Sequence, residues 1–193
     1  GRVADDVIAA GGRVVVAGNE RLVANPEDAR EAATEDARDS MGDLLDRHEG
    51  HPARATRVGQ FTRNRSYEEV TRGWGSAPIS EVLSYGERST LSEGLTAVDA
   101  PSRFAEATTA LAAADANVVV HVTGDGIPSG HPLVPVVKVT GDPGTAVALP
   151  DDIDLLARQA DSERLLDVAN GEMCLAEEHS LTEFAITRVG PSM

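Results

Sequence analysis

The sequence predicts an α/β fold, a mostly parallel sheet flanked by helices in Rossmann-like layers. Two short apolar runs, NVVVHV at 117–122 and VPVVKV at 134–139, have the length and β-branched content of buried strands. Helical spacing alternates with such strands along much of the chain, the order typical of a parallel sheet with crossover helices. The 193 residues suffice for one such domain, or for a domain with an appendage.

Residues 1–75 form the predicted N-terminal portion, packed on the same sheet as the rest. Apolar spacing predicts a helix over 2–10, and RVVVAG at 13–18 is a short buried strand. Asn25 and Pro26 are a typical helix start, and the helix is expected to run to about His48. The stretch 50–75 carries five arginines and is predicted to be a long loop with one short helix over 67–72.

Residues 76–193 form the predicted C-terminal α/β domain, and here the alternation is regular. Its expected helices are 77–86, 102–114, one within 142–150, 162–171 and 174–186, and its expected strands are 95–99, 117–124, 133–141 and 152–157. Ligands are expected at the carboxyl ends of these strands.

Charge excludes several classes of partner. Seventeen basic residues against 32 acidic ones give a net charge of −15, which repels nucleic acid and anionic membrane surfaces. No apolar run approaches the roughly 18 residues of a membrane span, and no export signal opens the chain, so a cytoplasmic location is expected. The single cysteine, Cys174, excludes a disulfide framework within the chain and is interpreted as a packing residue.

The cations are unevenly divided, with sixteen arginines and one lysine, Lys138. Abundant carboxylates with almost no lysine and few aromatics favour adaptation to a salty cytoplasm, where counter-ions screen the repulsion. A GC-rich genome is the alternative explanation for arginine in place of lysine. On either interpretation most carboxylates are solvated surface groups.

The loop VTGDGIPSGHP at 122–132 is the first candidate site. Its glycines allow backbone N–H groups to approach a carboxylate or phosphate, although the spacing matches neither a Walker loop nor a dinucleotide fingerprint. The alternative is an ordinary tight connection. His121, Asp125 and His131 around this loop could approach a divalent cation, whereas a strand histidine such as His121 is more often a packed core residue.

Lys138 is the second candidate, because a buried ammonium is costly unless it is paired. A lysine there could stabilise an enolate or act as a base, and the alternative is a structural ion pair or a lysine that reaches solvent. The strand pattern predicts that Lys138 lies at the carboxyl end of its strand and faces the loop 123–130. Glu20 after the first strand, and Glu68 and Glu69 in the basic stretch, are further candidates, each with a solvated carboxylate as the alternative.

Five segments together resemble the altronate/galactarate dehydratase (UxaA) family. NVVVHVTGDGIPSGHPLVPVVKVTGDP resembles its TTGRG-type loop and the following strand, and matching segments lie on both sides, AAGGRVVVAGNE, APISEVLSYGER with LTAVDAPS, and GEMCLAEEHSLTEFAI. About two-thirds of the chain matches in the family's order. The resemblance implies the C-terminal part of a longer dehydratase-like polypeptide.

The family pattern is incomplete in this chain. Glu68 and Glu69 match its paired acids, but Val70 replaces the lysine that follows, and Asp125 stands where the loop arginine would be. The family's upstream G-S-D element is absent from the sequence, and its central signature is shortened. Thr123, Gly124, Gly126 and Lys138 match.

The resemblance implies β-elimination of water from an aldonic or aldaric acid, giving a 2-keto-3-deoxy acid. It implies Lys138, Glu68 and Glu69 as catalytic residues, and Thr123, Gly124, Asp125 and Gly126 as contacts of a small acidic sugar metabolite. A divalent metal, Fe²⁺ or Mn²⁺, is expected, with Glu20, His121 and His131 as candidate ligands. Expected partners are an N-terminal half or partner subunit, and a homo-oligomer is an option. Alternatives are a non-catalytic member that binds an acidic metabolite, a scaffold subunit, and a dehydratase of altered specificity.

Overall fold

A computed structural model describes residues 1–49, 62, 64–160 and 162–186. It divides into two compact units, one built on Gly1–Asp115 and the other on Ala116–Ala185. Among the described residues there are two three-stranded sheets, and every strand pairing within them is parallel. The predicted α/β class is therefore confirmed, with two small sheets in place of one. The predicted boundary at residue 75 falls inside the first unit.

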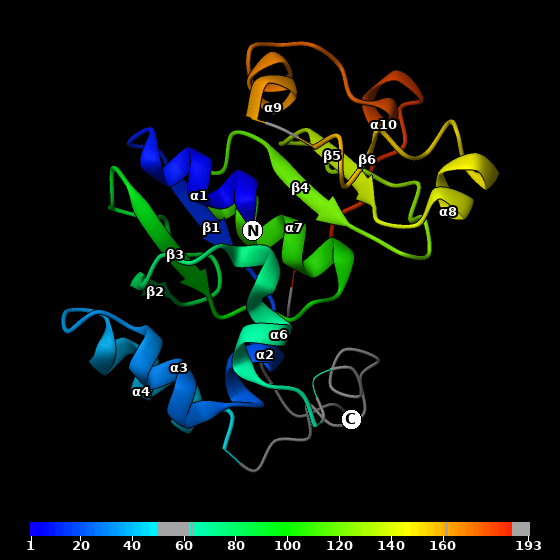
Figure 1. Ribbon diagram of the computed structural model, residues 1–193. Helices are drawn as coiled ribbons and strands as arrows, with labels where there is room; N and C mark the ends of the chain where they lie inside the picture. The colour runs from blue at the N-terminus through cyan, green and yellow to red at the C-terminus, as the bar shows by residue number, and fades with distance from the viewer. Residues whose placement is uncertain (50–61, 63, 161, 187–193) are drawn as a thin grey trace. The chain divides into compact units, whose positions relative to one another are not determined.

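The first unit contains a sheet with strand order β1-β3-β2, formed by Arg13–Val16, Gly94–Val98 and Ile79–Leu83. Its helical elements are α1 (Arg2–Ala9), α2 (Glu20–Val23), α3 (Pro26–Ala32), α4 (Arg38–Arg47), α6 (Tyr67–Thr71), the 3₁₀ turn η2 (Arg72–Trp74) and α7 (Phe104–Ala113). Helix α1 contacts β1 and α4 contacts β2 (Figure 1). The core between them is aliphatic, with Leu22, Met41, Leu44 and Ile79 at most 1% exposed.

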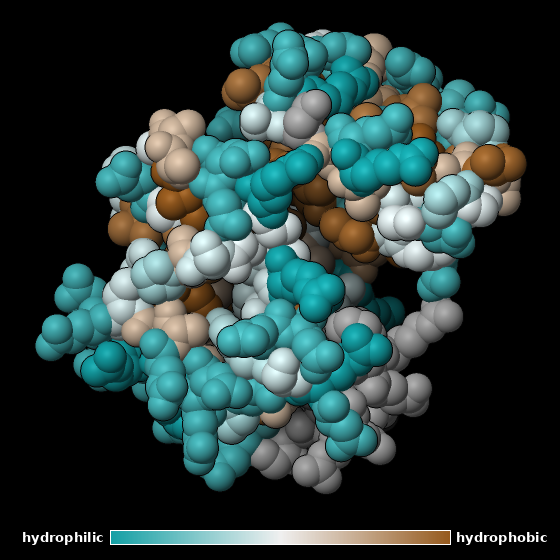
Figure 2. All heavy atoms as spheres, in the orientation of Figure 1, coloured by the Kyte–Doolittle hydropathy of each residue, from teal (hydrophilic) through white to brown (hydrophobic). Residues whose placement is uncertain are grey.

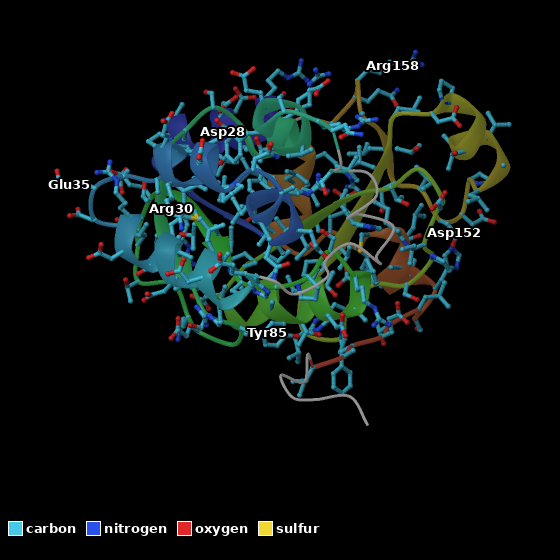
Figure 3. The ribbon with its side chains drawn as sticks, turned by 90° about the horizontal axis from the view of Figure 1, so that it is seen from below. Asp28, Arg30, Glu35, Tyr85, Asp152 and Arg158 are labelled. Atoms are coloured by element: carbon cyan, nitrogen blue, oxygen red, sulfur yellow. The ribbon has the colours of Figure 1, made fainter. Side chains whose placement is uncertain are left out.

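Charged side chains cover the outside of the α3–α4 hairpin. Asp28 and Glu35, labelled in Figure 3, are exposed, while Ala29 and Met41 on the inner side of the same helices are fully buried. This division follows the amphipathic spacing of the sequence.

The second unit contains a sheet with strand order β4-β5-β6, formed by Val119–Val122, Val136–Thr140 and Leu155–Leu156. The associated helices are α8 (Pro143–Ala148), α9 (Ser162–Ala169) and α10 (Leu175–Glu178). Every residue of β5 is buried, as expected for the central strand of a covered sheet. Several apolar side chains of this unit are nevertheless exposed, among them Val122 at 68% and Val147 at 81%, and Figure 2 shows brown patches over β4 and α8.

Three predicted helices differ in the structure. The segment 77–86 was predicted as a helix because the spacing of Ile79, Val82 and Leu83 suits one helix face. In the structure these residues belong to strand β2, which pairs with β3. The long helix after Asn25 is interrupted at Ala33, since the backbone N–H of Thr34 donates to the carbonyl of Ile79 (2.9 Å) and the chain there is extended.

The last predicted helix, 174–186, is helical only in α10. It ends where Ser180 adopts φ +56° and Thr182 forms a bridge with Gly130. The predicted short helix at 67–72 is confirmed by α6. The loop predicted over 50–61 lies outside the described residues. No helix in the described ranges is long and apolar enough to cross a membrane.

Candidate functional site

Each unit places polar side chains near the carboxyl ends of its strands, the edge at which α/β sheets bind ligands. In the first unit they form the His48–Asp99 cluster, defined as Asn19, Arg47, His48 and Asp99. In the second unit they form the glycine loop, defined as residues 123–131, together with Lys138, which contacts it.

Three elements build the His48–Asp99 cluster. Asn19 lies in the turn after β1, Asp99 directly follows β3, and Arg47 and His48 are the last residue and the C-cap of α4. Because β1 and β3 are parallel neighbours, the segments after them leave the sheet at the same edge. The backbone N–H groups of Gly18 and Asn19 both donate to the carbonyl of Ala100, which ties the two segments together.

Asp99 is the centre of this cluster. Its Oδ1 lies 2.7 Å from His48 Nε2 and 2.8 Å from Asn19 Nδ2, and its Oδ2 lies 3.6 Å from Arg47 Nε. The Asp99 side chain is 8% exposed, the His48 side chain 32% and the Arg47 side chain 48%. A buried carboxylate thus holds two cationic or ionisable groups that reach solvent.

The electrostatics of the pair follow from these contacts. The hydrogen bond to Asp99 raises the pKa of His48 above 6.5, and burial opposes this only in part. Burial alone would raise the pKa of Asp99, but the hydrogen bonds from His48 and Asn19 and the charge of Arg47 hold it below its usual value. The imidazole therefore keeps its proton to a higher pH than a free histidine does, because its pKa is raised.

Glu20, predicted as a metal ligand, lies beside this cluster and makes structural contacts. Its two carboxylate oxygens each lie 3.1 Å from the backbone N–H donor of Ser102, and Oε2 also accepts from Ser102 Oγ at 2.9 Å. The residue is 5% exposed. Glu20 thereby fixes the turn between β3 and α7.

Glu68 and Glu69, predicted as catalytic residues, are exposed on α6. Glu69 completes a capping box: its Oε2 accepts from the backbone N–H of Ser66 at 3.0 Å, and this hydrogen bond lowers the pKa of Glu69. Arg21 Nη1 donates to the carbonyl of Val70 at 2.6 Å and so ties α6 to α2. The structure thus gives Glu69 a helix-capping contact.

The glycine loop is fixed by its own hydrogen bonds. Thr123 Oγ1 accepts from the backbone N–H groups of Asp125 and Gly126, each at 3.2 Å, so these two donors are already used within the loop. The carbonyl of Gly124 accepts from Thr145 Oγ1 at 3.1 Å. At the far end, Gly130 donates to the carbonyl of Leu181 at 2.6 Å. Gly124, Asp125 and Pro128 are the exposed residues of the loop.

Lys138 is the third of five residues in β5 and is completely buried. Its ammonium donates to the carbonyl of Pro128 and thus faces the glycine loop, as predicted, although from the middle of the strand and not from its end. Burial lowers the pKa of Lys138, while the carboxylates of Asp154 and Asp152 oppose that shift. Asp154 also accepts from the backbone N–H of Lys138 at 2.7 Å. The buried Lys138 thus supports the loop through the carbonyl of Pro128.

His121 and His131, predicted as metal ligands, lie on β4 and in the glycine loop. Burial and the neighbouring charge of Lys138 lower the pKa of His121 to about 4, so its imidazole is neutral at pH 7. His131 is buried, and its Nδ1 accepts from the backbone N–H of Leu133 at 3.2 Å. Within the described ranges no three His, Cys, Asp or Glu side chains come close enough together to hold a metal ion.

The sequence analysis did not identify the His48–Asp99 cluster. It named His48 only as the expected end of a helix, and it did not name the other three residues as candidates. Asn19 and Asp99 carried a usable signal, because each is a polar residue just after a predicted strand, at the edge where ligands are expected. His48 and Arg47 carried none, since their position depends on where α4 ends and how it packs on the sheet.

Comparison with known proteins agrees with the sequence resemblance. A family model described as D-galactarate/altronate dehydratase, C-terminal, matches residues 1–192. The altronate dehydratase of Bacillus subtilis (strain 168) is 34% identical over 136 residues, and that of Escherichia coli (strain K12) is 32% identical over 135 residues. Each alignment covers 64% of this chain and 27% of the relative, so the matched region spans about a quarter of either protein. The chain belongs to the D-galactarate/altronate dehydratase family and corresponds to its C-terminal part.

Proposed function

We propose that this chain is the C-terminal part of a sugar-acid dehydratase. The observation that carries the proposal is the family match over residues 1–192, nearly the whole chain. The relatives named altronate dehydratase support an aldonic or aldaric acid as the substrate class. The reaction is the β-elimination of water, in which a proton leaves the carbon next to the carboxylate and the neighbouring carbon loses its hydroxyl. The enol that remains tautomerises to a 2-keto-3-deoxy acid.

We propose the glycine loop as a substrate contact. Thr123, Gly124, Asp125 and Gly126 belong to the segment that resembles the family's TTGRG-type loop, and the exposure of Gly124 and Asp125 supports this role. Lys138 would serve the reaction as a positioning residue, because its ammonium holds the carbonyl of Pro128 inside the loop. Asp125 in place of the arginine supports a preference different from that of the relatives, since a carboxylate repels an acidic group of the substrate.

A metal centre does not fit the described residues on their own. The expected ligands Glu20 and His131 make other hydrogen bonds, and the described ranges contain no group of three side chains, His121 included, that could hold a metal ion. Fe²⁺ or Mn²⁺ as a cofactor therefore depends on the family resemblance alone.

We propose the rest of a longer dehydratase polypeptide as the partner of this chain. The relatives extend well beyond the matched quarter, and the second unit exposes apolar side chains such as Val122, Leu133 and Val147. Exposed apolar patches of this kind are typical of surfaces that another part of a protein covers.

The experiment is an assay of the full-length protein on a panel of aldonic and aldaric acids, altronate and galactarate included, with Fe²⁺ or Mn²⁺ present. We expect a 2-keto-3-deoxy acid from at least one of them. Saturable binding of a sugar acid without product would favour the non-catalytic alternative. Neither product nor binding across the panel would contradict both.

A further inference from the structure

The His48–Asp99 cluster has the features of a proton-transfer site that neither the family description nor the sequence prediction assigns. It lies at the carboxyl edge of the β1-β3-β2 sheet and joins three separate elements. Asp99 is nearly buried, whereas His48 and Arg47 are partly exposed, so the ionisable ring and the guanidinium face solvent around a fixed carboxylate.

Asp99 also determines which nitrogen of His48 can react. The distance of 2.7 Å between Asp99 Oδ1 and His48 Nε2 places the Nε2 hydrogen toward the carboxylate, and Asn19 Nδ2 donates to the same oxygen. In this tautomer Nδ1 carries the lone pair of the neutral ring. Among the described residues His48 Nδ1 has no hydrogen-bond partner. This is the arrangement in which a carboxylate orients a histidine and stabilises its charged form.

One exposed cation of the cluster can bind an anionic ligand. Arg47 Nε lies 3.6 Å from Asp99 Oδ2, and the Arg47 side chain is 48% exposed, so a carboxylate in solution can reach its guanidinium. In a chain with a net charge of −15, Arg47 is the exposed cation of this cluster, whereas the carboxylate it contacts, Asp99, is 8% exposed. Glu20 is the other carboxylate whose charge raises the pKa of His48. It is buried and accepts hydrogen bonds from Ser102.

We propose that His48 is the proton-transfer group of the elimination, with Asp99 as its positioning residue and Arg47 as the cation that binds the substrate carboxylate. The inference rests on the dehydratase function proposed above. His48 Nδ1 takes the proton from the carbon next to the carboxylate, and the C–H electron pair forms the enolate. The imidazolium then returns this proton to the neighbouring hydroxyl as its C–O bond breaks. Water leaves, the enol remains and His48 is neutral again, so no other acid or base is required.

The test compares His48→Gln with His179→Gln in the full-length protein, with altronate or whichever panel acid the wild type converts. His179 is an exposed histidine at the end of α10 and serves as the matched control. We expect His48→Gln to lower kcat at least ~100-fold with KM within about threefold, the range that general acid–base catalysis supplies. His179→Gln should match the wild type. Arg47→Gln should instead raise KM.

Asp99→Asn provides a second reading if His48→Gln folds poorly. The amide no longer stabilises the imidazolium, so the pH profile of kcat should shift its histidine limb to lower pH, an effect that loss of fold alone does not produce. An unchanged kcat in folded His48→Gln, or an unchanged pH profile in Asp99→Asn, would overturn the inference and leave the dehydratase function standing. No product from the wild type on any sugar acid would overturn the proposed function and this inference with it.

Discussion

Lys138 is a buried lysine whose ammonium makes a hydrogen bond inside the protein and does not reach solvent. The side chain is completely buried, and its ammonium donates to the carbonyl of Pro128 in the glycine loop. A lysine in such surroundings is desolvated, and the neighbouring Asp154 and Asp152 offset only part of that cost. The only lysine of the chain therefore lies where its long side chain can fill a buried space and its ammonium can donate to the Pro128 carbonyl.

Lys138→Met should change the free energy of unfolding by no more than about 1 kcal/mol, because a methionine fills a similar volume without the desolvation cost. Lys138→Ala should cost about 2–5 kcal/mol, because it leaves a cavity in β5. In Lys138→Met the backbone N–H groups of 124–127, 129 and 130 should exchange faster with solvent. Chemical unfolding and hydrogen exchange measure the two effects. Equal destabilisation by both variants would contradict this account of Lys138.

The His48–Asp99 pair should make stability depend on pH. The folded pKa of His48 is raised, so its contribution is complete below about 6.5 and is lost as the pH rises through the raised value. The folded pKa of Asp99 is lowered, so its contribution is present above about 3.8 and is lost as the pH falls through the lowered value. The wild type should exceed Asp99→Asn in stability most between these limits. Urea unfolding across the pH range checks this, and a difference that does not vary with pH would rule it out.

In the glycine loop, Gly126 is required for the backbone conformation, whereas Gly124 is not. Gly126 has φ +64°, and a Cβ there would lie 2.1 Å from Leu149 Cδ1, whereas a Cβ on Gly124 has no heavy atom within 4 Å. We expect Gly126→Ala to destabilise the chain by about 1–2 kcal/mol and Gly124→Ala to be neutral or slightly stabilising. Thermal unfolding of the two variants provides the measurement. Similar melting temperatures for both would show that the loop adjusts freely.

At the level of elements, the sequence predicted those whose pattern is local. Strands β4 and β5 and helices α7 and α9 have apolar runs or spacings that specify one type of element. The segment of β2 was misassigned, because its apolar spacing suits a helix as well and pairing with β3 decides between the two. The break between α3 and α4 depends on the bond from Thr34 to Ile79, 45 residues away along the chain. Such non-local bonds leave no signal in a local pattern.

The candidate site was predicted less completely than the fold for the same reason. The glycine loop is a contiguous segment with a recognisable composition, and both it and Lys138 were identified from the sequence. The His48–Asp99 cluster combines segments 29 to 80 residues apart, and its key distances follow from the parallel pairing of β1 and β3. A prediction of it would require the packing of α4 on the sheet.

The whole molecule should respond to salt. With a net charge of −15 on 193 residues, self-repulsion is screened as the Debye length falls from about 10 Å at 0.1 M salt to about 3 Å at 1 M. We expect the melting temperature to rise between low salt and molar KCl. A melting temperature that does not change over this range would remove the interpretation of the chain as adapted to salt and favour a compositional origin of its arginines.

We propose that this chain is the C-terminal part of a sugar-acid dehydratase and that it does not carry the whole reaction. The measurement is NMR detection of 2-keto-3-deoxy acid formed from altronate and galactarate by the full-length protein and by this chain alone, each against a metal-only blank. We expect product from the full-length protein and none above the blank from the chain, because the family's upstream element and most of its central signature are missing here. Product from the isolated chain, or no product from the full-length protein, would contradict the claim.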